Sequence, residues 1–308
     1  MKILLAQPTV LRFKWELTVL LDNLNSLHFP LQNVVLLFAG NSNDYAEYFH
    51  SEYGVESHTY QDNRLDKGYI PSIRPYLWWQ YLSEDQQREK EAYLYIDSDV
   101  IFRELPIVPN DLSPNKWYCA DTLGYTNYTY VHTRPYGDEI VDSLNSIVGV
   151  NTEQLTTIDG GMGGAQWFMC QPTKDYWEHV YHDCIDIYNY FQSIPDKTDI
   201  GRSTGGFIQT WTAEMFAQVW VLAAFDITPV VTDELSFSWA TDNINNYYEH
   251  KLFHNAGATS DMYDVFYKGN YIARDPFSDD LSFVSTDKAS YKYVQAINAS
   301  KHTKLPNG

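Results

Sequence analysis

The chain has 308 residues, of which 44% are hydrophobic and 20% are charged, a composition that indicates a packed globular protein and excludes a disordered one. Its net charge of −19 excludes a large nucleic-acid footprint, which needs many lysines and arginines, but leaves room for a small basic groove. Three cysteines without metal-ligand spacing favour a reducing compartment, and no apolar run has the length of a membrane span, so we expect a soluble, cytoplasmic protein.

The first hundred residues alternate short apolar runs with helical patterns. Strands are expected over residues 2–6, 33–38, 56–60 and 92–96, and helices over 15–27, 43–53 and 76–82. Ser72 is expected to cap the third helix, with Pro75 in its first turn. This alternation is typical of a mainly parallel sheet with helices on both faces.

The segment Asp97-Ser98-Asp99 follows the fourth expected strand directly. In open α/β sheets, ligands bind beyond the carboxyl ends of the strands. Two carboxylates at such a place form an oxygen site for a divalent cation that also grips a phosphate. The alternative is that Asp97 and Asp99 only shape a turn or cap a helix.

Beyond residue 102 the pattern changes to one strand over 117–120 and helices over 140–148, 175–191 and 212–225, the last with Thr212 as its expected cap. The second of these helices carries an aromatic stripe, which helical spacing identifies as core, not as a cofactor site. The stripe comprises Tyr176, Trp177, Val180, Tyr181, Cys184, Ile187, Tyr188 and Phe191. From residue 281 onward the chain is rich in Ser, Lys and Asn, so a peripheral tail is expected there.

The run Tyr93-Leu94-Tyr95-Ile96-Asp97-Ser98-Asp99-Val100 resembles the metal-binding strand end of the GT-A class of glycosyltransferases. Two later segments resemble the glycogenin-like and lipopolysaccharide-galactosyltransferase-like branch of that class. One is the glycine-rich segment from Asp159 to Met169, followed by Gln171-Pro172, and the other is His254-Asn255-Ala256-Gly257. The resemblance implies a GT-A nucleotide-binding sheet with an acceptor-side elaboration.

The same resemblance implies a catalytic domain over residues 1–275, with a nucleotide-sugar-binding half over 1–102 and an acceptor-side half over 103–275. Residues 276–308 then form the tail. It also implies that His254 completes a site for Mn²⁺ or Mg²⁺ with Asp97 and Asp99, and that Lys268 contacts the donor diphosphate. The usual Lys-Pro-Trp of the branch is absent at Lys268.

Several further residues are candidates for donor binding. Topology points to the loop after the first strand (Ala6, Gln7 and Thr9) and to Asp62 after the third. Ser98 is placed to touch the ribose, and Arg74 to offer a bidentate phosphate contact; the alternative for Arg74 is an ordinary arginine on a helix shoulder.

Two acids are candidates for the reacting centre. Glu214 is expected in the first turn of a helix, where it is either a general base toward the acceptor hydroxyl or a complement to the helix dipole. Asp159 precedes the glycine-rich segment, at a position where the family has Asn. Glycines there either let a substrate approach the backbone or serve a folding turn.

The expected function is metal-dependent transfer of a sugar from a nucleotide-sugar donor, with UDP-sugar as the default. The acceptor is a saccharide, a lipid-linked saccharide or, in an alternative, hydroxymethylated DNA, whose target base must be exposed. Alternatives of another class are a nucleotidyltransferase, although Gln7-Pro8-Thr9-Val10 is not a glycine-rich phosphate loop, and a non-catalytic sugar- or metal-binding module.

Overall fold

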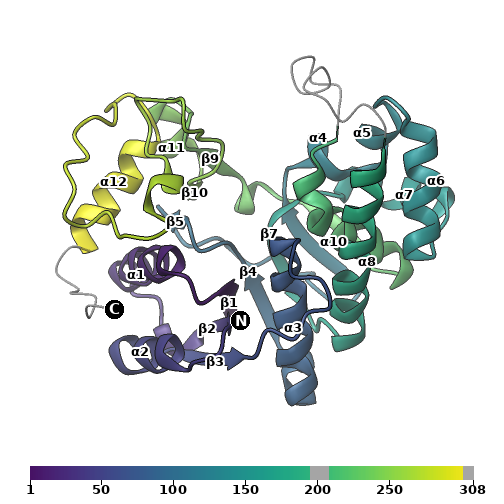
Figure 1. Ribbon diagram of the computed structural model, residues 1–308, viewed down its shortest axis with the longest axis horizontal. Helices are drawn as coiled ribbons and strands as arrows, with labels where there is room; N and C mark the ends of the chain where they lie inside the picture. The colour runs from purple at the N-terminus through teal and green to yellow at the C-terminus, as the bar shows by residue number, and fades with distance from the viewer. Residues whose placement is uncertain (195–207, 301–308) are drawn as a thin grey trace. The chain divides into compact units, whose positions relative to one another are not determined.

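The structure is a computed structural model that describes residues 1–194 and 208–300. The chain divides into two compact units that are interleaved along the sequence. Unit 1 comprises the described residues of Met1–Lys2, Tyr60–Tyr95 and Pro109–Thr232, and unit 2 those of Ile3–Thr59, Ile96–Val108 and Asp233–Gly308. Each unit therefore combines segments that lie far apart in the sequence, as the change of colour within each unit in Figure 1 illustrates.

Unit 2 opens with the strand–helix alternation that the sequence predicts. Its elements are β1 (Lys2–Pro8), α1 (Leu11–Ser26), β2 (Val34–Ala39), α2 (Asp44–Tyr53) and β3 (Glu56–Tyr60), and the strands lie in the order β3-β2-β1. The strands β1 and β2 pair in parallel, with Ile3 opposite Val34. Every residue of β2 is buried, which is the reason why this strand reads as a continuous apolar run.

A second, smaller sheet of unit 2 has the order β5-β10-β9, formed by β5 (Val100–Phe102), β10 (Leu252–His254) and β9 (Phe237–Trp239). The strand β10 is antiparallel to β5, with His254 opposite Val100, and parallel to β9. This register brings His254 to the residue that directly follows Asp99 in the chain. The helices α11 (Ile244–Glu249) and α12 (Ser290–Ala299) complete this part of the unit (Figure 1).

The C-terminal segment differs from the peripheral tail expected beyond residue 275. Leu281, Val284, Tyr293 and Ile297 belong to a buried hydrophobic cluster together with Trp15 of α1. The indole Nε1 of Trp15 also donates a 2.9 Å hydrogen bond to the carbonyl of residue 271. The segment was expected to be peripheral because its composition is rich in polar residues, but some of these, such as Ser290, are themselves buried.

Unit 1 contains the strands β4 (Ala92–Tyr95), β7 (Gly164–Cys170), β6 (Lys116–Ala120) and β8 (Thr228–Val231), in that order. The strand β7 is antiparallel to both β4 and β6, whereas β6 and β8 are parallel. The strands β4, β6 and β8 therefore share one direction, and the expected mainly parallel α/β fold is confirmed.

The helices of unit 1 are α3 (Ile73–Glu84), α4 (Leu123–Thr126), α5 (Tyr128–His132), α6 (Gly137–Val148), α7 (Thr152–Ile158), α8 (Lys174–Ser193) and α10 (Ala213–Ala224). The helix α8 packs against α3 and α10 (Figure 1). Its aromatic stripe is buried as predicted except at Tyr188, which is half-buried, and Trp177 stacks on Trp78 with ring centroids 4.9 Å apart. Among the described helices, none is both long and apolar enough to cross a bilayer.

Ser72 and Thr212 stand at the N-cap positions of α3 and α10, as predicted, but without the expected side-chain bond. Instead, the Ser72 hydroxyl donates to the Tyr69 carbonyl at 2.8 Å, and the Thr212 hydroxyl donates to the Gln209 carbonyl at 2.6 Å. Both helices are preceded by a 3₁₀ turn, whose carbonyls compete for these hydroxyl groups.

The glycine-rich segment has a clear packing role in unit 1. A Cβ on Gly161 would lie 1.8 Å from the Pro229 carbonyl oxygen, and one on Gly163 would lie 2.2 Å from the Ala120 oxygen. Both distances are far below van der Waals contact, so these glycines let the backbone pass close to neighbouring strands. Of the two alternatives for the segment, the folding turn has this direct support.

Candidate metal centre

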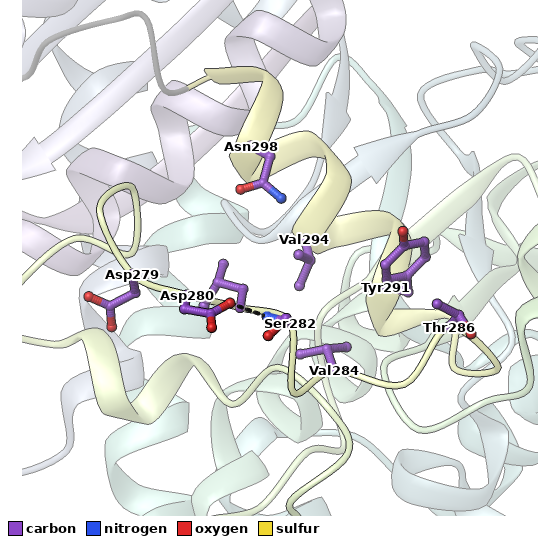
Figure 2. A pocket seen from close by; sticks show the side chains of 9 residues that line it. Asp279, Asp280, Ser282, Val284, Thr286, Tyr291, Val294 and Asn298 are labelled. Atoms are coloured by element: carbon purple, nitrogen blue, oxygen red, sulfur yellow. Dashed lines mark hydrogen bonds between the residues drawn. The ribbon is translucent and has the colours of Figure 1, made fainter.

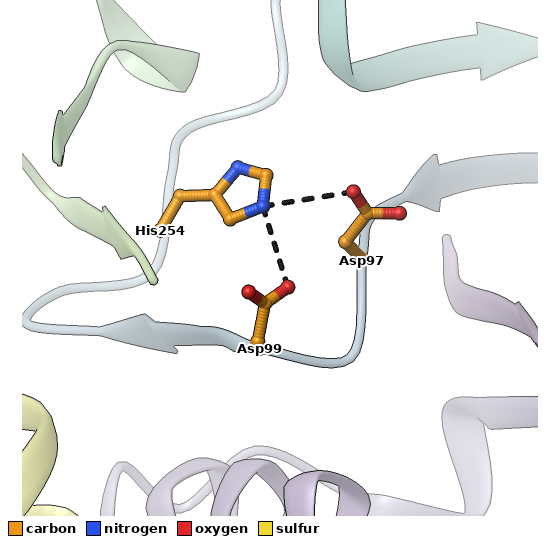
Figure 3. A group of neighbouring side chains, drawn as sticks. All are labelled: Asp97, Asp99 and His254. Carbon is orange, nitrogen blue, oxygen red and sulfur yellow. Dashed lines mark ion pairs between the residues drawn. The ribbon is translucent and has the colours of Figure 1, made fainter. Parts of the chain in front are cut away.

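The side chains of Asp97, Asp99 and His254 converge in unit 2 (Figure 3). Asp97 lies between β4 and β5, Asp99 directly precedes β5, and His254 ends β10. The imidazole Nε2 of His254 is 3.3 Å from Asp99 Oδ1 and 3.6 Å from Asp97 Oδ2. One ligand atom from each residue lies within 4.8 Å of the others, and Asp97 is the most exposed, with 28% of its side chain open to solvent.

These three residues fit a divalent cation by geometry and by chemistry. Two neighbouring ligands of an octahedral ion with metal–oxygen bonds of about 2.1 Å lie about 3 Å apart. The distances from the imidazole to the two carboxylates are close to that spacing. Carboxylate oxygens suit Mg²⁺ and Mn²⁺, and an imidazole nitrogen adds a ligand that transition ions bind well. The cluster is therefore a candidate site for such an ion.

Lys268 also reaches this cluster. Its ammonium group contacts Asp99 Oδ2, the oxygen that does not face His254. Burial alone would raise the pKa of Asp99, but the positive charge of Lys268 and the hydrogen bond from His254 hold this pKa far below its usual range. Asp99 is thus an anion at any ordinary pH, which is the state that a metal ligand requires.

Sequence reasoning missed two charged residues behind the cluster, Arg12 and Glu16 of α1. Ser98 donates its hydroxyl proton to Glu16 Oε2 at 2.6 Å, and Arg12 Nε donates to Glu16 Oε1 at 2.7 Å. The available signal was a pair of opposite charges four residues apart, with Glu16 standing between the apolar residues Trp15 and Leu17. The hydroxyl of Ser98, which was expected to touch the ribose, therefore donates inward, and only 6% of this residue is exposed.

The residues expected to bind the nucleotide lie in or beside β1. Ala6 and Gln7 are buried within the strand, and the amide of Gln7 donates to the Leu37 carbonyl at 3.2 Å. Thr9 follows the strand and donates both its backbone N–H and its hydroxyl to the Ala39 carbonyl. The contacts seen here link β1 to β2, and Thr9 is the most exposed of the three.

Arg74 and Glu214, which sequence reasoning selected separately, form an ion pair in unit 1. Arg74 lies in the first turn of α3 and Glu214 in the first turn of α10, with 2.6 Å between the guanidinium Nη2 and the carboxylate Oε2. The side chain of Glu214 is 2% exposed and that of Arg74 24%. The hydroxyl of Tyr69 accepts the backbone N–H of Glu214 at 2.8 Å, so the start of α10 is fixed beside this pair.

The other two candidate acids of unit 1 make local contacts. Asp62 accepts two bonds from the guanidinium of Arg64, at 3.0 and 3.1 Å. Burial works to raise the pKa of Asp62, but Arg64 lowers it below its ordinary value. Asp159 accepts both the backbone N–H and the hydroxyl of Thr129, at 3.0 and 2.6 Å, and so holds the start of α5.

A surface pocket of about 520 Å³ lies in the C-terminal part of unit 2 (Figure 2). Leu281, Val284 and Val294 give it an apolar wall, and Asp279 and Asp280 line one side. The backbone N–H of Ser282 donates to Asp280 at 2.9 Å. None of the residues that line this pocket belongs to the metal-site cluster, so this pocket does not coincide with the candidate chemistry.

Comparison with known proteins defines the fold. No protein-family model matches the chain, and no curated protein matches it in sequence. The solved structure of galactosyltransferase LgtC with donor and acceptor sugar analogues is similar, with 12% identity, a TM-score of 0.50 and coverage of 100% of this chain and 98% of LgtC. An active-site mutant of LgtC gives 14% identity, a TM-score of 0.50 and the same coverage.

The apo structure of WbbM, a bifunctional glycosyltransferase, covers 97% of this chain with 10% identity and a TM-score of 0.49. The chain spans about half the length of WbbM, 49% of that chain. The likeness to LgtC confirms the fold that the resemblance to GT-A glycosyltransferases implies.

Proposed function

We propose that this chain is a metal-dependent glycosyltransferase that moves a sugar from a nucleoside diphosphate donor, by default a UDP-sugar, to an acceptor hydroxyl. The observation that carries the proposal is the convergence of Asp97, Asp99 and His254 in a fold shared with LgtC. A divalent ion, Mn²⁺ or Mg²⁺, bound there would act as a Lewis acid toward the leaving diphosphate.

The residues of unit 2 would hold the donor's diphosphate end. Asp97 and Asp99 would supply negative charge for the cation, and His254 would supply an imidazole nitrogen. Lys268 carries a point charge beside Asp99, which suits it to a phosphate oxygen. With 24% of its side chain exposed, Lys268 can move from Asp99 toward a bound anion.

In unit 1, Glu214 is the stronger of the two candidate acids for the reacting centre. Its carboxylate is buried and its charge is matched by Arg74, so it is held as an anion in a fixed orientation. An anion of this kind stabilises positive charge that develops on a transferring sugar. Asp159 uses both carboxylate oxygens on Thr129, which favours a structural role for it.

The acceptor is proposed to be a saccharide or a lipid-linked saccharide. The net charge of −19 disfavours a DNA acceptor, because the protein would have to overcome repulsion from the phosphates. A cytoplasmic location fits the cysteines: in the part of the chain that the structure describes, Cys119, Cys170 and Cys184 form no disulfide.

The first test is thermal-shift and calorimetric titration of the purified chain with Mn²⁺ and Mg²⁺, followed by a panel of nucleotide sugars with and without a chelator. We expect the metal to stabilise the protein and one nucleotide sugar to add to this effect only when metal is present. Hydrolysis of that donor, or its transfer to a glycan panel, then identifies the reaction.

The matched variants are His254→Gln, which removes a proposed ligand, and His250→Gln, which removes a histidine of the same unit outside the cluster. The proposal requires loss of metal-dependent stabilisation in the first and its retention in the second. Binding of sugar without metal would instead support a non-catalytic module, and no response to any metal or nucleotide sugar would refute the proposal.

A further inference from the structure

We propose that Glu16 is a positioning residue of the metal site, which fixes the Asp97-Ser98-Asp99 turn through the hydroxyl of Ser98. This inference rests on the proposed function, because it assigns a role toward the cation that the cluster would hold. Glu16 lies in the second turn of α1, within unit 2, and its side chain is fully buried.

The contacts of Glu16 account for both of its oxygens. Ser98 donates to Oε2 at 2.6 Å, and Arg12 donates to Oε1 at 2.7 Å. Burial raises the pKa of the Glu16 carboxyl above its ordinary value, although Arg12 and the hydrogen bond from Ser98 work in the opposite direction. The carboxylate therefore has one bond that balances its charge and one that reaches the metal-binding turn.

Stability alone gives little reason for a carboxylate at this position. An acid in an apolar helix face has a large desolvation penalty, and apolar side chains of similar volume are often as stable as a buried ion pair or more so. Trp15 and Leu17, which precede and follow Glu16 in α1, are apolar and fully buried, and the counter-charge comes from Arg12 one turn earlier. The acid at this position is therefore better explained by the group that it orients, the hydroxyl of Ser98.

Ser98 stands between Asp97 and Asp99 in the chain, so the orientation of Ser98 influences the orientation of both proposed ligands. A second contact holds the same turn from the other side: the backbone N–H of Asn255 donates to the Asp99 carbonyl at 3.0 Å, next to His254. With both contacts, the turn is fixed at Ser98 by α1 and at Asp99 by the end of β10. Partners that orient metal ligands in this way typically change metal affinity by about 10- to 100-fold when removed.

The test is the affinity for Mn²⁺ alone, measured by isothermal titration calorimetry on the full chain without nucleotide. Glu16→Gln keeps the shape of the side chain but removes its charge, and Ser98→Ala removes the hydroxyl that Glu16 accepts from. We expect each substitution to weaken Mn²⁺ binding about 10-fold, and the double variant to bind no more weakly than either single one.

Thr18→Val is the matched control. Thr18 is buried in the same helix, and its hydroxyl donates to the Lys14 carbonyl at 3.0 Å, away from the cluster. This variant should lose stability but keep its Mn²⁺ affinity. If Glu16→Gln does not fold, Ser98→Ala carries the test alone, with the same expected loss.

The outcomes separate the two proposals. Mn²⁺ binding by the unmodified chain together with unchanged affinity in Glu16→Gln or Ser98→Ala overturns this inference and leaves the proposed function intact. Additive losses in the double variant overturn it as well, because they mean that Glu16 acts as a distant negative charge and not through Ser98. Absence of Mn²⁺ binding by the unmodified chain refutes the proposed function itself.

Discussion

The carboxylates clustered in unit 2 and the buried carboxylate of Glu214 in unit 1 have different surroundings. In unit 2, Asp97, Asp99 and Glu16 lie near three basic side chains, and two of the carboxylates turn toward one imidazole. In unit 1, Glu214 forms an ion pair with Arg74, which brings a positive charge to its carboxylate. The first arrangement concentrates negative charge where a cation can bind, whereas the second holds a single anion in a fixed orientation.

The comparison teaches that burial alone does not identify a site. Asp183 of α8 is half-buried in unit 1, and burial and the nearby Asp186 raise its pKa to about 7. Asp99 is buried more completely and its pKa is nevertheless lowered. What distinguishes Asp99 is the set of groups that favour its charged form. Substitutions in each region can test whether unit 2 binds the cation while unit 1 holds an anion in a fixed orientation.

The largest expected effect is that of Asp99→Asn. Removal of a ligand charge should weaken Mn²⁺ binding by more than the roughly 100-fold that marks the upper range for outer-shell partners, and should abolish metal-dependent donor turnover. Calorimetry and a donor-hydrolysis assay measure the two effects, and circular dichroism checks that the fold is retained. Asp261→Asn, an exposed acid of the same unit, is the control. Normal turnover in Asp99→Asn would remove the distinction between the two regions.

Glu214→Gln should have the next largest effect, with the opposite pattern. It leaves Arg74 partly buried without its counter-charge, and we expect a loss of about 2 kcal/mol, below the 3–5 typical of fully buried pairs because Arg74 is 24% exposed. Denaturant unfolding measures this loss. Transfer activity should fall, but Mn²⁺ affinity should stay the same, because all three proposed ligands belong to unit 2. If Glu214→Gln also lowered the Mn²⁺ affinity, the proposal that cation binding depends on unit 2 alone would be contradicted.

Asp183→Asn should make the protein more stable, by about 1–2 kcal/mol at pH 8 after allowance for solvent screening. The folded-state pKa of Asp183 is raised to about 7 from an ordinary value of 3.8. The folded state therefore binds the proton more tightly, so stability falls as the pH rises from 4 to 7. The substitution should remove that part of the pH dependence and have little effect at pH 4. Thermal melts at pH 4 and pH 8 test this, and an equal effect at both would contradict the assignment.

The smallest expected effect is that of Lys268→Met, and its sign differs between two ligands. Loss of a positive charge beside Asp99 should strengthen the binding of Mn²⁺ alone on the order of several-fold. The same change should weaken binding of the nucleotide sugar, because a phosphate contact is lost. Titrations with each ligand measure the two effects. Lys292→Met, which removes another lysine of unit 2, should change neither affinity, and weaker Mn²⁺ binding in Lys268→Met would be the contrary result.

The sequence predicts the fold of the first hundred residues well because its signals are local. The apolar run of β2 and the alternation around it follow from burial on the faces of one sheet, and the predicted 56–60 strand agrees with β3. Asp97 and Asp99 are also marked locally, by the strand that precedes them. The third cluster member, His254, was accessible only through the family resemblance, since nothing in its own neighbourhood signals a ligand.

Other features depend on contacts between distant segments and could not be predicted in the same way. The helix α12 is amphipathic but rich in polar residues, and its burial depends on Trp15 at the other end of the chain. Glu16 could be seen as an acid between two apolar residues of a helix, but its partner Ser98 is 82 residues away. Arg74 and Glu214 are likewise 140 residues apart, so neither residue's local sequence indicates that the two form an ion pair.

The interleaved path of the chain has a consequence for biosynthesis. The contact between Lys268 and Asp99 joins residues 169 positions apart, and the bond between Trp15 and residue 271 spans 256. A ribosome must therefore complete most of the polypeptide before unit 2 can fold. Until then, the apolar residues of α1 that pack against the C-terminal segment, such as Trp15, stay exposed to solvent. Such a nascent chain is a natural client for chaperones, and closing such long loops slows folding. Truncation shortly before residue 271 should consequently yield aggregated material in place of a smaller active protein.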